Sequence, residues 1–419
     1  MRVLLISWEY PPVIEGGLGR HVRKLCEHLV HQGQDVHVLT RGGGRLPAEE
    51  VRRGVTVHRV EEPPFPSDLD AFLRWVAGMN RDLAARGLSL SQDRDFDLVH
   101  SHDWLVADAA EQVARGRDLP WLVTVHATEF GRHQGWVQKH PQSYIHGIER
   151  RMSRRADRLI TCSEYMRGHV SRVFGVASER IAAIPNGVDP EDLEPIGGTD
   201  LAALRGRFAG PDDQLVLLVG RLVFEKGFHL ALDALAPLVK RTGRLRFVVA
   251  GTGTAEDELK RQARRLGLAR HGSFLGWVGD DMLHSLYRVA DLCIVPSIYE
   301  PFGIVALEAM ASGCLCVVAD TGGLREVVPD DGTAGLRFPA DDAKALQTIL
   351  EEVLTDEEVR QQLVSEAREH VLGFGWSEVA RSTACVYAEL ATRTTSSAVT
   401  SPTDPTTAAA SARAPSSGG

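Results

Sequence analysis

Residues Glu300 to Glu308 read E-P-F-G-I-V-A-L-E, and this stretch decides the fold that the sequence predicts. The apolar run at 291–296 just before it is typical of a buried strand, a proline and a glycine then mark a turn, and the following apolar residues favour a helix. Glu300 would therefore lie in a loop at the carboxyl end of a strand, and Glu308 on the helix that follows this loop. Ligands of open α/β sheets bind at such strand ends.

The spacing of these two glutamates argues against a hydrolase. The paired carboxylates of glycoside hydrolases lie roughly 5–10 Å apart, whereas eight residues of helix rise roughly 12 Å. The pair therefore favours two hydrogen-bond acceptors that hold separate parts of a long ligand rich in hydroxyl groups. The alternative is a solvated Glu300 and a Glu308 on a helix surface, without a functional role.

Composition limits the class of protein. A chain of 419 residues with 43% apolar and 25% charged residues is typical of a globular protein of two domains. The net charge of −9 argues against general binding of nucleic acid. The six cysteines form no C-x-x-C pair, so they predict neither a zinc site nor a disulfide framework. We expect a cytoplasmic protein, because the sequence shows no signal peptide and no apolar run of the length of a membrane span.

Short apolar runs alternate with helical patterns along the chain, which predicts parallel α/β sheets. The expected strands of the first half are 3–7, 35–40, 98–100, 121–126, 158–162 and 181–184. Those of the second half are 215–220, 245–250, 273–275, 291–296 and 315–319. The clearest helical patterns are 19–31, 105–114, 343–354, 357–372 and 377–390.

A turn-rich break at 184–189, followed by a polar segment, divides the two halves. We expect a first domain at 1–187 and a second at 188–375. A terminal helix at 376–391 would pack back toward the first domain. Residues 392–419 are almost entirely Thr, Ser, Ala, Pro and Gly, which favours a disordered tail.

A glycine-rich loop follows the first strand and contains Gly16, Gly17 and Gly19. Glycines before a helix let backbone N–H groups approach an anion. The dinucleotide fingerprint is incomplete, because Val22 replaces its third glycine. A second loop with Gly251 and Gly253 has a glutamate at that position. Both loops argue against a nicotinamide or flavin cofactor, and the alternative for each is a plain strand-to-helix turn.

Two cations follow the first strand of the second half, in the stretch G-R-L-V-F-E-K-G at 220–227. An arginine fork at Arg221 and a lysine point charge at Lys226 suit a diphosphate. The stretch is not a P-loop, because it lacks the G-x-x-x-x-G-K-[ST] pattern. The alternative is a surface salt bridge between one of these cations and Glu225.

Two histidine motifs also follow predicted strands: His102-Asp103-Trp104 and His126. A histidine at such a strand end would face the ligand, although a lone buried histidine more often has a structural role. The acidic stretch 93–97 looks like a metal-binding D-x-D motif, but it precedes its strand. It therefore predicts a polar loop, and we expect no metal site.

Taken together, these motifs resemble the family 4 retaining glycosyltransferases of the GT-B fold, from residue 1 to about residue 390. The stretches W-E-Y-P-P at 8–12, S-H-D-W at 101–104 and E-P-F-G at 300–303 are most similar to bacterial glycogen (α-glucan) synthase-type members. The resemblance implies two Rossmann-like parallel-sheet domains that face a central cleft. The first domain would bind the acceptor and the second the nucleotide-sugar donor.

The resemblance also implies a role for each site residue. Glu300 and the amides around Phe302, Gly303 and Ile304 would contact hydroxyl groups of the donor sugar, and Glu308 the ribose. Arg221 and Lys226 would neutralise the diphosphate, Gly16 and Gly17 would approach the phosphate or the acceptor, and His126 would lie beside C6 of the sugar. His102, Asp103 and Trp104 would lie on the acceptor side. No cofactor or metal is implied beyond a UDP- or ADP-sugar substrate.

The implied reaction is retaining, metal-independent transfer of a hexosyl group, in the first place glucosyl, to an α-1,4-glucan. Alternatives are a glycosyltransferase for a lipid or inositol-phosphate acceptor, a nucleotide-sugar epimerase, and a non-catalytic sugar-binding protein. The arginines between Arg150 and Arg158 allow weak contact with anionic lipid, with a solvated basic face as the alternative. The sequence does not determine the oligomeric state.

Overall fold

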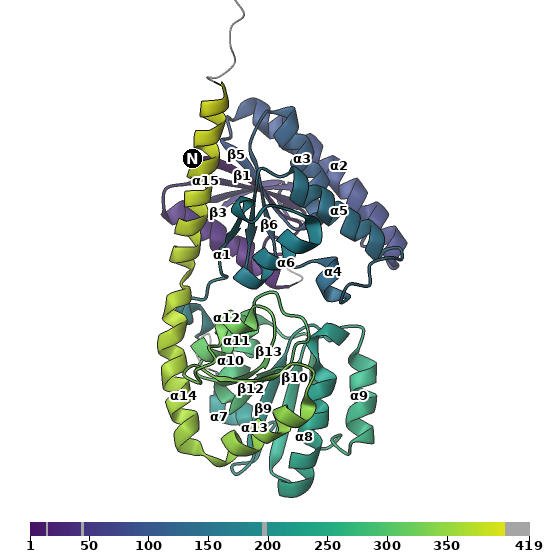
Figure 1. Ribbon diagram of the computed structural model, residues 1–419, viewed down its shortest axis with the longest axis vertical. Helices are drawn as coiled ribbons and strands as arrows, with labels where there is room; N and C mark the ends of the chain where they lie inside the picture. The colour runs from purple at the N-terminus through teal and green to yellow at the C-terminus, as the bar shows by residue number, and fades with distance from the viewer. Residues whose placement is uncertain (14–15, 43–45, 195–198, 399–419) are drawn as a thin grey trace, which may run out of the picture.

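The computed structural model describes residues 1–13, 16–42, 46–194 and 199–398. Two α/β domains are stacked along the long axis of the molecule, each with its own sheet flanked by helices (Figure 1). Both sheets are parallel apart from one edge strand. The prediction of two parallel-sheet domains is therefore confirmed.

The first domain contains a sheet of order β3-β4-β2-β1-β5-β6-β7-β8, in which only β3 runs antiparallel to its neighbour. Because the order reverses at β1, the loops after β1 and β5 lie at a switch point, where ligands of such sheets bind. The strands are β1 (Arg2–Ile6), β2 (Asp35–Arg41), β3 (Glu49–Arg52), β4 (Val55–Val60), β5 (Leu98–His102), β6 (Trp121–Val125), β7 (Arg158–Thr161) and β8 (Ile181–Ala183). The helices are α1 (Gly17–His31), α2 (Leu69–Asp93), α3 (Ala107–Gly116), α4 (Glu129–Arg132), α5 (Gln142–Arg155) and α6 (Glu164–Phe174).

The second domain contains a fully parallel sheet of order β11-β10-β9-β12-β13-β14. Its switch point lies between the neighbouring strands β9 and β12, which precede Lys226 and Glu300 respectively. The strands are β9 (Gln214–Val219), β10 (Leu245–Ala250), β11 (Gly272–Gly276), β12 (Leu292–Val295), β13 (Leu315–Asp320) and β14 (Leu336–Pro339). The helices are α7 (Leu201–Gly206), α8 (Phe228–Thr242), α9 (Glu256–Arg265), α10 (Asp280–Val289), α11 (Ile304–Ala311), α12 (Leu324–Val327), α13 (Ala343–Thr355) and α14 (Glu357–His370).

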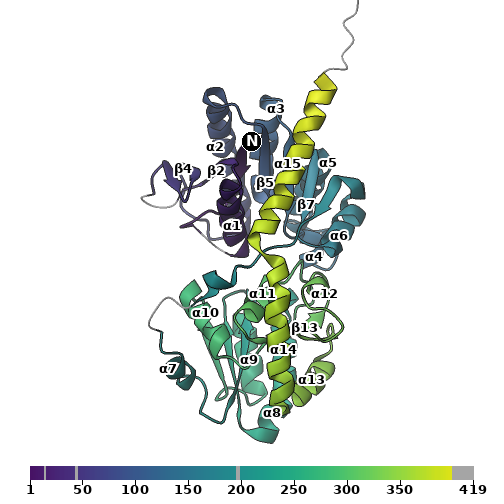
Figure 2. The same ribbon diagram turned by 90° about the vertical axis from the view of Figure 1, so that its left-hand side faces the viewer.

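The last helix, α15 (Trp376–Ala398), leaves the second domain and lies along the first, against α1 (Figure 2). Its apolar side shares a core with α1, to which the helices contribute, among others, Val22, Leu25, Leu29, Val379, Tyr387 and Leu390. The helix continues to Ala398, seven residues beyond the predicted end at residue 391. The rest of the predicted tail, 399–419, lies outside the described residues.

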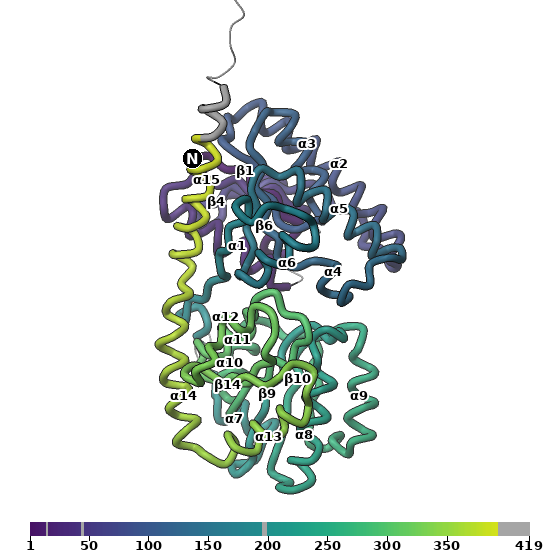
Figure 3. The backbone as a smooth tube through the Cα atoms, in the orientation of Figure 1, coloured from purple at the N-terminus to yellow at the C-terminus, as the bar shows by residue number. Residues whose placement is uncertain are grey.

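The chain crosses between the domains twice, and the two crossings lie side by side (Figure 3). The N–H of Val188 donates to the carbonyl of Phe374 at 2.8 Å. The N–H of Trp376 donates to the carboxylate of Asp189 at 3.4 Å. Gly187 packs so closely on Trp376 that an added Cβ would lie 2.7 Å from the indole ring. The domains are therefore joined by one compact double connection.

Tyr387 anchors α15 to the sheet of the first domain. Its hydroxyl lies 2.8 Å from His100 Nδ1, and the other ring nitrogen of this histidine lies 2.8 Å from Thr124 Oγ1. The tyrosine and the histidine are both fully buried. Burial lowers the pKa of His100 to about 3, so the ring is neutral at physiological pH. Both of its nitrogens have a hydrogen-bond partner.

We expect Tyr387→Phe to lower the free energy of unfolding by about 1–3 kcal/mol, because the variant leaves His100 Nδ1 buried without its partner. Urea denaturation measures the change. Tyr144→Phe, at a tyrosine that is 46% exposed, is the control and should shift stability by less than about 0.5 kcal/mol. An unchanged urea midpoint in Tyr387→Phe would show that this hydrogen bond does not stabilise the fold.

Candidate active site

The carboxyl-terminal loops of the two sheets face each other across the domain boundary (Figure 1). Ser163 Oγ, after β7, donates to the carbonyl of Pro301, after β12, at 2.7 Å. Glu326 of the second domain accepts the first N–H groups of α6, from Glu164 and Tyr165, at 2.9 and 2.8 Å. A carboxylate at a helix N-terminus is stabilised by the helix dipole. The predicted site residues of both domains are thus brought to one boundary.

Lys226 and Glu300 form an ion pair at the switch point of the second sheet. The Nζ atom lies 2.7 Å from Glu300 Oε2, and Ser297 Oγ donates to the same oxygen at 3.0 Å. The side chains of the pair are only 21% and 11% exposed. Both donors use Oε2, so the second oxygen Oε1 accepts from neither of them.

Gly227 makes this arrangement possible. It has a φ of 67°, and an added Cβ would lie 1.9 Å from the carbonyl oxygen of Pro296, at the end of β12. Only glycine permits so close an approach of two backbones in this conformation. The turn that carries Lys226 can therefore lie directly against the loop that carries Glu300.

Arg221 lies close to this pair but is less engaged. Its side chain is 60% exposed, and Nη2 lies 4.0 Å from Glu225 Oε1. An ion pair of that length and exposure contributes little to stability. The salt bridge with Glu225 that the sequence left as an alternative is therefore weak, and the guanidinium stays accessible at the carboxyl end of β9.

Glu308 is buried on α11 and meets a cation from the other domain. Its Oε1 lies 3.3 Å from Arg20 Nη1, and Tyr287 donates to Oε2 at 3.0 Å. Arg20, on α1, also pairs with Asp280. Burial raises the pKa of Glu308, and the positive charge of Arg20 opposes that rise. The alternative of a solvated helix-surface glutamate is therefore wrong.

The glycine loop before α1 is arranged around a carboxylate of its own chain. The N–H groups of Gly16 and Gly19 each lie 3.2 Å from Oε2 of the buried Glu9. This carboxylate occupies the end of α1 where the sequence predicts an external anion. A phosphate contact by Gly16 is therefore not supported. Gly17 instead faces α11, since an added Cβ would lie 3.6 Å from Ile304 Cδ1.

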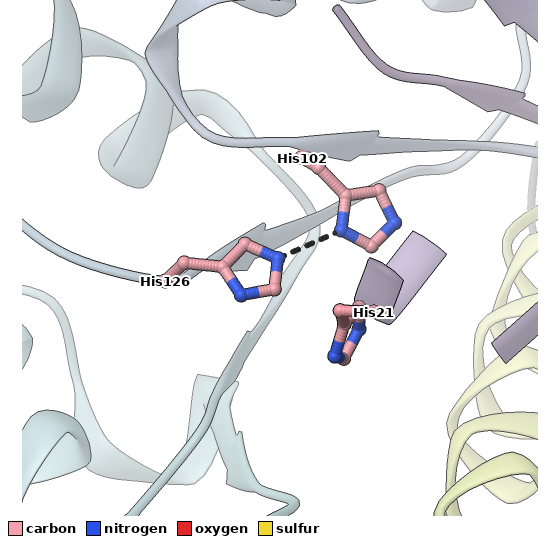
Figure 4. Close-up of side chains that lie close together, drawn as sticks. All are labelled: His21, His102 and His126. Atoms are coloured by element: carbon pink, nitrogen blue, oxygen red, sulfur yellow. Dashed lines mark hydrogen bonds between the residues drawn. The ribbon is translucent and has the colours of Figure 1, made fainter. Parts of the chain in front are cut away.

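Three histidines meet at the edge of the first sheet (Figure 4). His102, which ends β5, places Nδ1 3.0 Å from Nε2 of His126, which follows β6. His21, on α1, places Nδ1 2.7 Å from the side-chain oxygen of Asn186. Burial, together with the positive charge of Arg132, lowers the pKa of His126 to about 4. The His126 ring is therefore neutral at physiological pH and retains a lone pair on one nitrogen.

Asp103 and Trp104 have structural contacts. Asp103 adopts a φ of 57° and accepts the N–H of His126 at 2.7 Å. Burial raises the pKa of Asp103 to about 6. Trp104 packs into the main hydrophobic core, and His102 is fully buried. Direct contact of these three side chains with an acceptor is therefore not supported.

The residues after Glu300 begin α11. Phe302 is buried, with its ring centroid 6.3 Å from that of Phe374, and Gly303 precedes the helix with a φ of 116°. The helix starts at Ile304. The first N–H groups of an α-helix have no partner within it. They are therefore suitably placed to donate to a ligand beside Glu300.

The α4 segment of the first domain packs against the second domain. At Gly131 an added Cβ would lie 2.2 Å from the ring of Tyr299. Behind it, Glu149 accepts the N–H of Glu129 at 2.9 and 3.0 Å with its two oxygens. Burial raises the pKa of Glu149 to about 8, although the nearby Arg132 opposes the rise. A carboxyl group that is protonated at neutral pH therefore lies beneath the site.

The arginines between Arg150 and Arg158 do not share one helix face, because α5 ends at Arg155 and Arg158 begins β7. Most of them have partners: Arg151 pairs with Asp108 and Glu111, Arg155 with Glu111, Arg158 with Glu389, and Arg154 donates to the carbonyl of Phe174. These pairs reduce the positive charge that the segment can offer to a lipid surface. Among the helices that the structure describes, none combines the length and apolar character of a membrane span.

Comparison with known families matches both halves of the chain. The model described as Glycosyltransferase Family 4 matches residues 15–192, and the model described as Glycosyl transferases group 1 matches residues 205–370. The glycogen synthase of Mycobacterium tuberculosis (strain ATCC 25618 / H37Rv) is 39% identical, over 92% of this chain and 94% of that protein. A D-inositol 3-phosphate glycosyltransferase of Kineococcus radiotolerans is 32% identical, over 92% of this chain and 94% of that protein.

Solved structures share the fold. Sucrose-phosphate synthase from Thermosynechococcus elongatus has a TM-score of 0.80 and 24% identity, over 94% of this chain and 99% of that one. The catalytic domain of Starch Synthase IV from Arabidopsis thaliana, bound to ADP and acarbose, has a TM-score of 0.72 and 22% identity. The match covers 94% of this chain and 99% of that one. The two-domain architecture is therefore that of GT-B glycosyltransferases.

The buried Glu149 predicts a pH dependence of stability. Between its usual pKa near 4.5 and its raised pKa of about 8, only the unfolded chain releases this proton. The free energy of unfolding should therefore fall as pH rises through this range, by at most about 1.4 kcal/mol per pH unit. Below pH 4.5 the contribution of Glu149 to the free energy of unfolding is fully present, and above about pH 8 it is lost.

We expect Glu149→Gln to remove this slope, which urea unfolding from pH 5 to pH 8 measures against the wild type. Glu358→Gln, at an exposed glutamate on α14, is the control and should keep the wild-type slope. Parallel pH profiles for wild type and Glu149→Gln would contradict the raised pKa.

Proposed function

This chain belongs to the family 4 glycosyltransferases, and from that premise we propose that it transfers a glucosyl group from a nucleoside-diphosphate sugar to an α-1,4-glucan. The identity of 39% to proteins named glycogen synthase, over nearly the full length of both chains, supports a glycogen-synthase-like activity. The acceptor is the part of the proposal that depends most on this likeness.

The observation that carries the proposal is the pair of Lys226 and Glu300 at the switch point of the second sheet, 2.7 Å apart and largely shielded from solvent. Cleavage of a sugar–phosphate bond leaves negative charge on the diphosphate and positive charge on the sugar. Fixed cations stabilise that leaving group without reorganisation during the reaction. Lys226 and the exposed Arg221 supply these cations, and Glu300 Oε1 accepts from a sugar hydroxyl.

Glu308 would hold the ribose of the donor. Its oxygens accept from Arg20 and Tyr287, so a ribose hydroxyl either shares these oxygens or displaces Arg20. Since Arg20 belongs to the first domain, nucleotide binding would alter a contact across the domain boundary. The donor site of the second domain and the acceptor side of the first are thereby linked.

We propose that transfer retains the anomeric configuration and needs no metal ion. Glu300 is engaged by a lysine and a serine on one oxygen, which suits binding of sugar hydroxyls better than nucleophilic attack. Retention then follows from attack on the face that the diphosphate leaves, with a phosphate oxygen accepting the proton of the acceptor hydroxyl. Arg221 and Lys226 provide the positive charge that a divalent ion supplies in other phosphate chemistry.

The contacts between the domains support protection of the donor from water. The hydrogen bond from Ser163 to Pro301 and the packing of Gly131 on Tyr299 close the boundary beside the proposed sugar site. Exclusion of water strengthens the electrostatic interactions inside a site and prevents hydrolysis of a reactive donor. Opening and closing at the double connection near Gly187 would then admit and release substrates.

A second candidate acceptor is an inositol phosphate. Relatives that are 30–33% identical over most of this chain carry the name D-inositol 3-phosphate glycosyltransferase. Their identity is lower than that of the glycogen synthases, so the glucan remains our first proposal. The two acceptors differ in charge and size, and one assay separates them.

An acceptor screen tests the function. With UDP- or ADP-glucose, we expect glycogen or maltose to stimulate release of the nucleoside diphosphate, and inositol 3-phosphate to have no effect. Lys226→Ala should lower the glycogen-dependent rate about 10²–10³-fold, because it removes charge stabilisation of the leaving group. Lys240→Ala, at an exposed lysine on α8, is the control and should keep the wild-type rate.

Stimulation by inositol 3-phosphate and not by glycogen would replace the glucan with the second acceptor. Wild-type turnover in Lys226→Ala, with the fold verified by circular dichroism, would contradict the assignment of the donor site.

A further inference from the structure

The proposed transfer reaction leaves one cluster of side chains unexplained. His21, His102 and His126 come from α1, the end of β5 and the loop after β6, and their rings lie close together (Figure 4). One ring nitrogen of each lies within 4.8 Å of one ring nitrogen of each of the others. Such convergence of three imidazoles is more than hexose binding requires.

The ring of His21 presents a buried lone pair. Its Nδ1 lies 2.7 Å from Oδ1 of Asn186, which can only accept, so Nδ1 carries the proton and Nε2 does not. Nε2 is buried, and no partner for it exists among the residues that the structure describes. Buried polar atoms in folded proteins nearly always have partners, so this unpaired nitrogen of His21 indicates a ligand.

We propose that His21, His102 and His126 bind one late first-row divalent ion, of which Zn²⁺ is the reference. Imidazole nitrogens are preferred ligands of these ions, whereas Ca²⁺ and Mg²⁺ require oxygen ligands. With Zn–N bonds of about 2.0–2.1 Å, tetrahedral ligand nitrogens lie about 3.3 Å apart. His102 Nδ1 and His126 Nε2 are already 3.0 Å apart, so side-chain shifts of about 1.5 Å or less would complete the set.

The surroundings of the cluster suit a metal ion. Metal-binding histidines usually donate their second N–H to an oxygen that fixes the ring, and Asn186 does this for His21. The closest acidic side chain in the sequence is Asp103, which accepts the backbone N–H of His126. The neighbouring cation Arg132 is itself balanced by Asp103 and by Glu129, which lies 3.9 Å away. His126 is the most exposed of the three histidines.

The ion would act as an inhibitor and not as a cofactor. The family resemblance implies that His126 lies beside C6 of the donor sugar in the proposed function, so an ion bound to this ring would compete with the sugar for it. That consequence rests on the proposed function. Binding of the ion does not, and a binding experiment therefore tests the site even if the acceptor or the reaction is different.

The test is calorimetric titration of the full chain with Zn²⁺ after treatment with a chelator. We expect one ion per chain for the wild type and at least 10-fold weaker binding for His21→Ala. His21→Gln, which can still donate to Asn186, serves as a second variant in case the smaller side chain disturbs folding. The control is His31→Ala, at an exposed histidine of the same helix, which should bind like the wild type.

Absence of stoichiometric Zn²⁺ binding to the wild type would overturn the site. Wild-type affinity in His21→Ala and His21→Gln, both verified as folded, would overturn it equally, because the ion would then be bound elsewhere. Loss of affinity in both variants, with the control unchanged, would establish it.

Discussion

The parallel direction of the strands is the constraint on which this molecule depends. Carboxyl ends of parallel strands lie at one edge of a sheet, and here the two such edges face each other. Lys226 and Glu300 are 74 positions apart in the chain, but they follow the neighbouring strands β9 and β12 and form an ion pair. Arg20 and Glu308 come from different domains and also meet at this boundary. The order and direction of the strands therefore bring these distant residues together.

This boundary holds polar groups that burial makes costly. Glu308, Asp103 and Glu149 all have a pKa raised by burial, and each is compensated only in part by a cation or by N–H groups. Asp103 also keeps a left-handed backbone conformation that is strained for a residue other than glycine. Such costs are typical of functional sites, where stability is given up for charges held in place. The large apolar cores of the two domains compensate for them.

Much of the fold could be predicted from the sequence, because buried parallel strands are continuous apolar runs. Three strands were not predicted. β3 is mostly polar and exposed, and β14 is a short edge strand that ends in a proline, so the patterns of both are weak. β4 is largely buried and reads V-T-V-H-R-V, a strand pattern that the sequence analysis missed. The helix α15 continues through Thr and Ser residues, whose composition alone suggests disorder.

The candidate site could be predicted only where its residues are close in the sequence. The glutamates after β12 and the cations after β9 lie in short motifs beside apolar runs. By contrast, the contacts of Arg20 with Glu308, of His21 with Asn186 and of Glu9 with the glycine loop depend on tertiary packing. No short sequence pattern predicts contacts of this kind. The glycine loop was therefore predicted to meet an external anion, although a carboxylate of the chain occupies that position.

The central claim is that the second domain holds a nucleoside diphosphate with its ribose at Glu308. Calorimetric titration of wild type and Glu308→Ala with UDP, ADP and pyrophosphate tests it most directly. Because hydrogen bonds to a charged group contribute about 1.5–3 kcal/mol, the variant should bind the preferred nucleoside diphosphate about 10-fold or more weakly. Pyrophosphate, which lacks a ribose, should bind both proteins equally. Equal affinity of wild type and variant for the nucleoside diphosphate would contradict the claim.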